Sequence, residues 1–86
     1  MKLSELPNIG VELEKKLEIA GIHTPDELIK TGSFEPLQLI GITQEPGCIS
    51  TLYALEGAIQ GIRWHHLPAD VKNGLREKLR EDQRKR

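Results

Sequence analysis

The chain has 86 residues with a net charge of −1, and 37% of them are hydrophobic, which suffices for one small helical core but not for a large enclosed cavity. A single cysteine excludes an intramolecular disulfide and is typical of a reducing compartment, and no apolar run is long enough to cross a bilayer. These features predict one cytoplasmic domain over residues 1–86, with no membrane partner.

The charges are distributed unevenly along the chain. Residues 1–60 carry four Lys and nine Asp or Glu, for a net charge of −5, whereas residues 61–86 carry eight Lys or Arg and four acids, for +4. A basic C-terminal segment can attract nucleic acid, or it can be a solvated helix end whose cations suit the helix dipole. Both interpretations stay open, and we expect residues 81–86 to form a frayed basic tail.

Helix start and stop signals are frequent, whereas no segment shows the sustained alternation of a strand. Thr24 to Glu27 has the pattern of an N-terminal capping box with proline at the first helical position, and Ser33 is expected to cap the next helix. Gly21 is well placed to end a helix in the left-handed conformation, and Gly41 repeats that arrangement.

The sequence predicts an all-α fold, a single compact domain of five to six short helices. The expected helices cover residues 2–6, 11–20, 25–31, 34–40, 48–63 and a last segment that opens at Pro68.

The stretch that begins at Cys48 should be the central helix. Five residues recur at helical spacing as one apolar stripe: Cys48, Leu52, Leu55, Ile59 and Ile62. A second stripe contains only small residues: Ala54, Gly57, Ala58 and Gly61. A helix that is apolar on most of its circumference is normally surrounded by other helices. The small residues predict close packing against a neighbour, and a homodimer is one way to supply that neighbour.

The short turn Pro7–Gly10 precedes the second helix, and together with its flanking helices it resembles a helix-hairpin-helix motif. In that motif, backbone N–H groups at a helix N-terminus point toward a DNA phosphate. The candidate phosphate-binding residues are Asn8, Ile9, Gly10, Lys15 and Lys16. Glu12 and Glu14 lie in the first helical turn and would repel a phosphate, so the alternative interpretation is a packing corner between helices.

The run from Leu52 to Pro68, LYALEGAIQGIRWHHLP, carries a family resemblance. Together with LPNIG at Leu6 to Gly10 and the capping box, it resembles the C-terminal domain of the TfoX/Sxy proteins, and the likeness covers roughly Leu3 to Leu79. The resemblance implies a helix-hairpin-helix-like (SAM-like) helical domain in a regulator of bacterial natural competence, acting as a transcriptional co-activator. Full-length members carry a separate N-terminal domain, so the chain looks like a stand-alone copy of the second half.

No residue set predicts catalysis, a metal or a cofactor. Adjacent histidines such as His65 and His66 diverge, and no Cys or carboxylate lies at zinc-site spacing from them. Cys48 lies on the apolar stripe, and the nearby hydroxyls have no neighbouring base. An enzyme is therefore not expected.

The end of the central helix is the leading candidate site, because Trp and Arg recur at interface centres. Trp64 either packs across the junction with the last helix or contributes to a contact patch. The expected partner-binding residues are Glu56, Gln60, Arg63, Trp64, His65 and His66. The leading interpretation is a non-enzymatic interaction domain in bacterial transcriptional regulation that contacts the transcription machinery or a regulator. The alternative is direct, weakly specific DNA binding through the Pro7–Gly10 hairpin and the basic C-terminal helix.

Overall fold

The computed structural model describes residues 1–85, which form five α-helices and two short 3-10 helices without a strand. The prediction of an all-α fold is confirmed. In chain order the elements are η1 (Leu3–Glu5), α1 (Val11–Ile19), α2 (Pro25–Thr31), α3 (Phe34–Leu39), α4 (Cys48–Gln60), η2 (Trp64–His66) and α5 (Ala69–Arg84).

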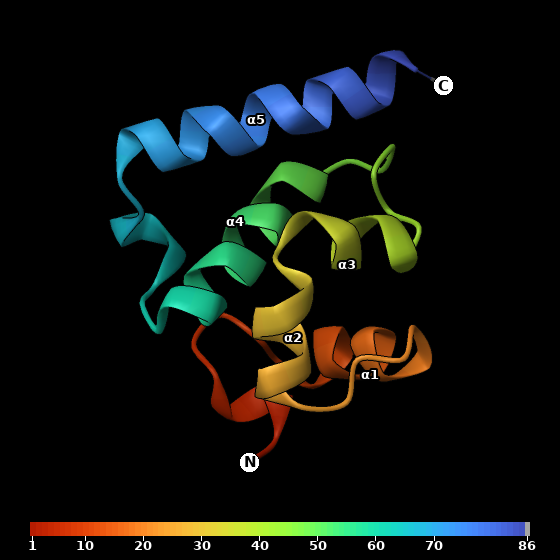
Figure 1. Cartoon of the computed structure of the whole chain (residues 1–86), viewed down its shortest axis with the longest axis vertical. Helices are drawn as coiled ribbons and strands as arrows, with labels where there is room; N and C mark the ends of the chain where they lie inside the picture. The colour runs from red at the N-terminus through yellow and green to blue at the C-terminus, as the bar shows by residue number, and fades with distance from the viewer. Residues whose placement is uncertain (86) are drawn as a thin grey trace.

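Helix α4 lies at the centre of the molecule, as its apolar circumference predicted. It contacts α2, α3, η2 and α5, and Figure 1 shows α5 crossing one end of the bundle while η1 and α1 lie at the other. The fully buried side chains are mostly leucines contributed by several elements, so the core is continuous around α4. The most deeply buried of these are Leu3, Leu17, Leu28, Leu37, Leu52 and Leu55.

The central helix is shorter than predicted, because it ends at Gln60 and not at Arg63. Gly61 adopts the left-handed conformation with φ of 75°, and the N–H of Ile62 donates to the carbonyl oxygen of Gly57 at 2.9 Å. This arrangement closes the helix with a glycine cap. Arg63 to His66 therefore leave the helix and enter the separate turn η2.

Two of the predicted helix ends are confirmed. The hydroxyl of Thr24 accepts a hydrogen bond from the Glu27 N–H at 3.2 Å, and α2 begins at Pro25. At the end of α1, Gly21 has φ of 95° and the Ile22 N–H donates to the carbonyl oxygen of Leu17 at 2.9 Å. Local capping chemistry accounts for both ends.

The predicted cap at Ser33 is wrong. Its side chain makes no capping hydrogen bond to α3 and instead donates from Oγ to Glu56 Oε1 on α4 at 2.6 Å. Ser33 is buried, and a carboxylate is a stronger acceptor than a neutral group. The hydroxyl therefore joins the α2–α3 connection to the central helix.

Most of the segment that was expected to be a frayed basic tail belongs to α5, and its fraying stays a prediction. Helix α5 continues to Arg84, because polar side chains in its last turns bond to the rest of the domain. Gln83 Nε2 donates to the carbonyl oxygen of Thr43 at 2.9 Å, and Gln38 Nε2 donates to Asp82 Oδ1 at 3.0 Å. The final residue of the expected tail, Arg86, lies outside the described residues.

No helix among residues 1–85 is both long enough and apolar enough to cross a membrane.

At Gly57, the small-residue stripe packs closely against other segments of the same chain. A Cβ atom on this residue would lie 2.6 Å from Asn8 Nδ2, 2.8 Å from the Ile62 carbonyl oxygen and 3.2 Å from the Trp64 Cα. The neighbours of the stripe at this point are thus the N-terminal hairpin and the chain that follows α4. Gly61 is exposed, and its role is the positive φ that ends the helix.

We predict that Gly57→Ala destabilises the domain by about 1–3 kcal/mol, because the new methyl group overlaps a backbone carbonyl that cannot move without cost. Helix propensity alone would predict the opposite sign, a gain of roughly 1 kcal/mol. The matched control is Gly74→Ala in α5, where a Cβ meets nothing within 4 Å and stability should rise by about 0.5–1 kcal/mol. Urea unfolding of both variants measures the difference, and equal gains in stability would contradict the close approach at Gly57.

Candidate interaction surface at the end of the central helix

The side chain of Asn8 joins the N-terminal hairpin to the end of α4. Asn8 is the only non-glycine residue with positive φ (70°) in the described part of the chain. Its Nδ2 donates to the carbonyl oxygens of Ile62 at 2.9 Å and Ala54 at 3.4 Å, and its Oδ1 accepts from the Trp64 N–H at 3.2 Å. Two acceptors face one end of the amide and a donor faces the other, so these partners determine its orientation. We call these three bonds the Asn8 network.

Trp64, held by the Asn8 network through its backbone, stacks between two other rings. Its centroid lies 6.0 Å from that of Tyr53 and 4.1 Å from that of His65, with interplanar angles of 22° and 27°. The Lys72 Nζ lies 5.6 Å from the Trp64 centroid, within the range of a cation–π contact. The indole is half-buried, so it packs across the junction with α5 and also presents part of its surface.

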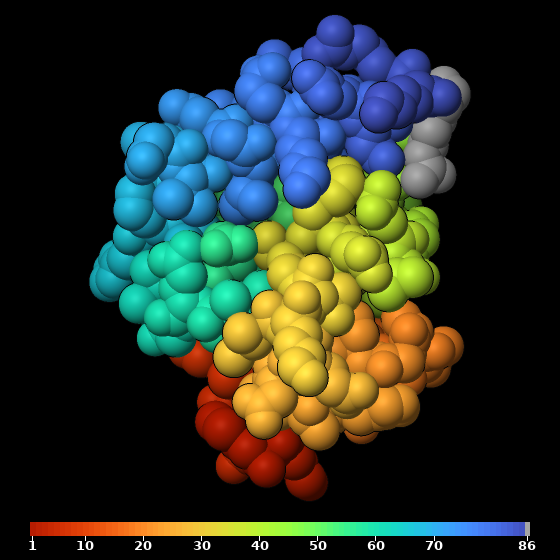
Figure 2. Space-filling model, viewed as in Figure 1, coloured from red at the N-terminus to blue at the C-terminus, as the bar shows by residue number. Residues whose placement is uncertain are grey.

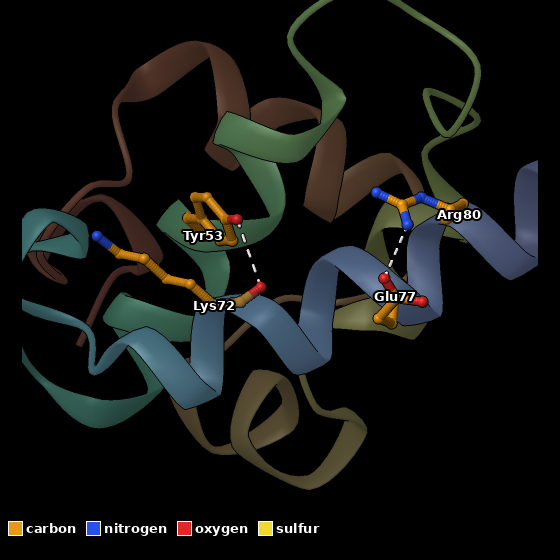
Figure 3. Close-up of polar contacts among 4 residues, drawn as sticks. All are labelled: Tyr53, Lys72, Glu77 and Arg80. Carbon is orange, nitrogen blue, oxygen red and sulfur yellow. Dashed lines mark hydrogen bonds and ion pairs between the residues drawn. The ribbon is translucent and has the colours of Figure 1, made fainter.

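Lys72 connects this aromatic stack to α5. The Tyr53 hydroxyl donates to the Lys72 carbonyl oxygen at 3.4 Å, a contact drawn in Figure 3, and Lys72 Nζ donates to the His65 carbonyl oxygen at 3.4 Å. Further along α5, the same figure shows the exposed ion pair between Arg80 and Glu77, at 2.9 Å. Such a pair contributes little stability, whereas the contacts around Lys72 determine how α5 meets η2.

Three residues close to Trp64 in the chain are exposed, namely Arg63, His65 and His66. Among residues 1–85, the side chains of Arg63 and His66 make no hydrogen bond or ion pair, so they are free to contact another molecule. In Figure 2 the segment from the end of α4 into α5 forms the left edge of the molecule. We define the Trp64 corner by its six members: Tyr53, Arg63, Trp64, His65, His66 and Lys72.

Two of the six residues that were predicted to form one patch, Glu56 and Gln60, make side-chain hydrogen bonds of their own, and partner binding by the six residues stays a prediction. Glu56 accepts from Ser33, and its Oε2 accepts from Gln60 Nε2 at 2.7 Å. Glu56 also lines a surface hollow together with residues of α3 and α5, including Phe34 and Lys78. Its bonds are therefore made toward α3, whereas the ring contacts of Trp64 are made with Tyr53, His65 and Lys72.

Tyr53 and Lys72 belong to the corner but were not among the predicted partner-binding residues. Tyr53 lies one turn before Gly57 on α4, so it shares a helix face with the small-residue stripe. The spacing between Tyr53 and Gly57 was therefore the signal in the sequence that could have placed Tyr53 near the end of α4. Lys72 was counted only as part of a basic segment.

The predicted phosphate-binding residues have different environments. Ile9 is buried, at 5% exposure, and the Asn8 side chain is bonded within the protein. Gly10, Lys15 and Lys16 are exposed at the start and along the surface of α1. The hairpin is thus a packing corner for Asn8 and Ile9. Phosphate binding by the exposed residues stays a prediction.

Two other predicted features can be located. Cys48 is buried at the start of α4, with Gln83 Nε2 3.6 Å from its Sγ. Within residues 1–85 no three His, Cys, Asp or Glu side chains come together in a group that could hold a metal ion.

These features define a small all-helical domain with a hairpin packed onto the end of its central helix. Residues 1–79 match the TfoX C-terminal domain family, and the chain belongs to that family. No curated protein matches the chain.

Two crystal structures of Listeria monocytogenes proteins have the same fold. A triclinic form of an uncharacterised protein is 48% identical, covers 96% of this chain and 94% of its own, and superposes with a TM-score of 0.89. A tetragonal form of a protein of unknown function is 51% identical, covers 92% of this chain and 96% of its own, with a TM-score of 0.84.

We predict that Asn8→Gly lowers the free energy of unfolding by about 1–3 kcal/mol, because the partly buried backbone groups of Ile62 and Trp64 lose their hydrogen bonds to the side chain. Glycine tolerates positive φ, so this variant keeps the turn and removes only the side chain. Asn73→Ala, at an exposed position of α5, is the control and should change stability by less than about 0.5 kcal/mol. If Asn8→Gly unfolds at the same urea concentration as the parent, the turn alone matters and the Asn8 network does not.

Proposed function

We propose that the chain is a non-enzymatic interaction domain in bacterial transcriptional regulation, and that it contacts a protein partner through the Trp64 corner. Membership of the TfoX C-terminal domain family supports the regulatory class. The observation that carries the proposed contact site is the half-buried indole of Trp64, which stacks on two rings and is followed and preceded in the chain by the exposed, unbonded side chains of His66 and Arg63.

The physical reason is pre-organisation. Association loses free energy when flexible side chains become ordered, but the Trp64 ring is already held by Tyr53 and His65, and its backbone is held by Asn8. Tryptophan and arginine contribute more to binding than most residue types when they become desolvated at an interface centre. The corner combines both in one short turn.

The charge of the corner indicates the chemistry of its partner. Arg63 and Lys72 are cationic, and the corner contains no carboxylate. Complementary potentials favour encounter between protein surfaces. The partner surface should therefore present Asp or Glu side chains around an apolar recess that accepts the edge of the indole.

Direct DNA binding is a second candidate, because the hairpin turn does form with Asn8 at positive φ. One of the two acids expected to repel a phosphate is also engaged elsewhere, since Glu14 Oε2 accepts from the Ser4 N–H at 3.0 Å. Glu12 remains exposed in the first turn of α1, and it still opposes an approaching phosphate. We rank this candidate below the protein contact for that reason.

The protein contact is tested with Arg63→Glu/His66→Glu against a control of similar charge change, Lys30→Glu/His23→Glu, whose parent side chains are exposed. Affinity capture from a lysate of the bacterium that encodes the chain, with quantitative mass spectrometry, should recover a transcription protein with the parent and the control. The corner variant should recover roughly tenfold less of it, because two central interface residues are replaced by carboxylates. Equal recovery by all three would contradict a contact at the Trp64 corner.

The protein-contact proposal and the DNA-binding candidate predict different results with duplex DNA. We expect no change in the fluorescence anisotropy of a labelled duplex at about 50 mM salt, because the few cations near the hairpin neutralise too few phosphates. Binding that falls steeply toward about 200 mM salt, and that is abolished in Lys15→Gln/Lys16→Gln but not in Lys30→Gln, would favour the DNA candidate instead.

A further inference from the structure

A second surface, remote in sequence from the Trp64 corner, exposes apolar side chains. Ile19 at the end of α1 is 88% exposed and Leu39 at the end of α3 is 52% exposed. Both line one shallow hollow, which we call the Ile19 groove. Its lining residues are Lys16, Ile19, Ala20, Leu39, Ile40, Gly41, Ile42 and Glu45.

The charges of the Ile19 groove lie on opposite walls. One wall is α1, which contributes Lys16 one turn before Ile19, and the other is the end of α3 with the following loop, which contributes Glu45. The remaining lining residues are apolar or glycine, so the groove has no net charge. Neither Lys16 nor Glu45 makes a side-chain hydrogen bond or ion pair within the described residues.

We propose that the Ile19 groove is a two-fold symmetric contact between two copies of this chain. In an isologous interface each surface patch faces its own copy. A two-fold axis through the groove brings the α1 wall of one copy onto the α3–loop wall of the other. Lys16 then meets the partner copy's Glu45 twice, and Ile19 and Leu39 of both copies become buried together.

The charge pattern of the Ile19 groove favours a second copy of this chain as its occupant over a molecule whose charges all have the same sign. A wholly cationic or anionic groove would repel its own copy, but one cation and one anion on opposite walls are complementary to themselves. The small-residue stripe cannot serve this purpose at Gly57, because that position is covered by Asn8 and by the chain after α4. The Ile19 groove therefore offers an interface that leaves the Trp64 corner free.

The groove is small, so the dimer should be reversible and populated at chain concentrations of about 0.1–1 mM. Sedimentation equilibrium of the parent chain should show this concentration dependence, and Ile19→Asp should remain monomeric. The control is Ile29→Asp, because Ile29 is also an exposed isoleucine, at 52%, but lies on α2 outside the groove. Circular dichroism should give the same helix content for all three, which separates loss of the interface from loss of the fold.

Charge reversal tests the two-fold arrangement itself. Lys16→Glu alone and Glu45→Lys alone should each weaken self-association by about tenfold, because both symmetry-related pairs become repulsive. An equimolar mixture of the two single variants should form a heterodimer, since each acid then faces a lysine, and the double reversal in one chain should restore the homodimer. A parent chain that is monomeric at about 1 mM, or a dimer that these substitutions leave unchanged, overturns the proposal.

Discussion

The structure depends most on the close approach of Asn8 to Gly57. The Asn8 side chain occupies the space that a Cβ on Gly57 would need, and its bonds join residues separated by 46, 54 and 56 positions in the chain. A partly buried amide with unpaired donors would cost free energy, so the hydrogen bonds of Asn8 and its packing against Gly57 support each other. Glycine at position 57 is unfavourable for an isolated helix. The close packing of the Asn8 side chain against this position explains why a residue without a Cβ is needed.

The same contact determines where the candidate functional residues lie. The helix closes at Gly61, and the Asn8 network then holds the backbone at Ile62 and Trp64. Tyr53 and Lys72 complete the support of the indole from α4 and α5. Three parts of the chain thus orient one short turn, which leaves Arg63 and His66 exposed beside a ring that is already ordered.

Local signals in the sequence predicted most of the fold. The apolar period identified the central helix, and the capping residues placed the start of α2 and the end of α1, because these features depend on neighbours only a few residues away. The features that could not be predicted depend on distant residues. Ser33 bonds to Glu56 across 23 positions instead of capping α3. Within the predicted six-residue patch, the stacking of Trp64 on Tyr53 also joins residues that are not neighbours in the chain. The role of Asn8 could not be predicted for the same reason, since a hairpin residue gives no local sign that its side chain reaches the other end of α4.

Native-state amide hydrogen exchange shows most directly whether Asn8 holds the Trp64 corner in place. The Trp64 N–H donates only to a side chain of another segment, so it has no helical bond to protect it. We expect this amide to exchange as slowly as those of Leu55 and Ala58 within α4, because it opens only when the domain unfolds. Exchange of the Trp64 amide at the rate of an unprotected loop, while α4 remains protected, would show that Asn8 does not hold the corner.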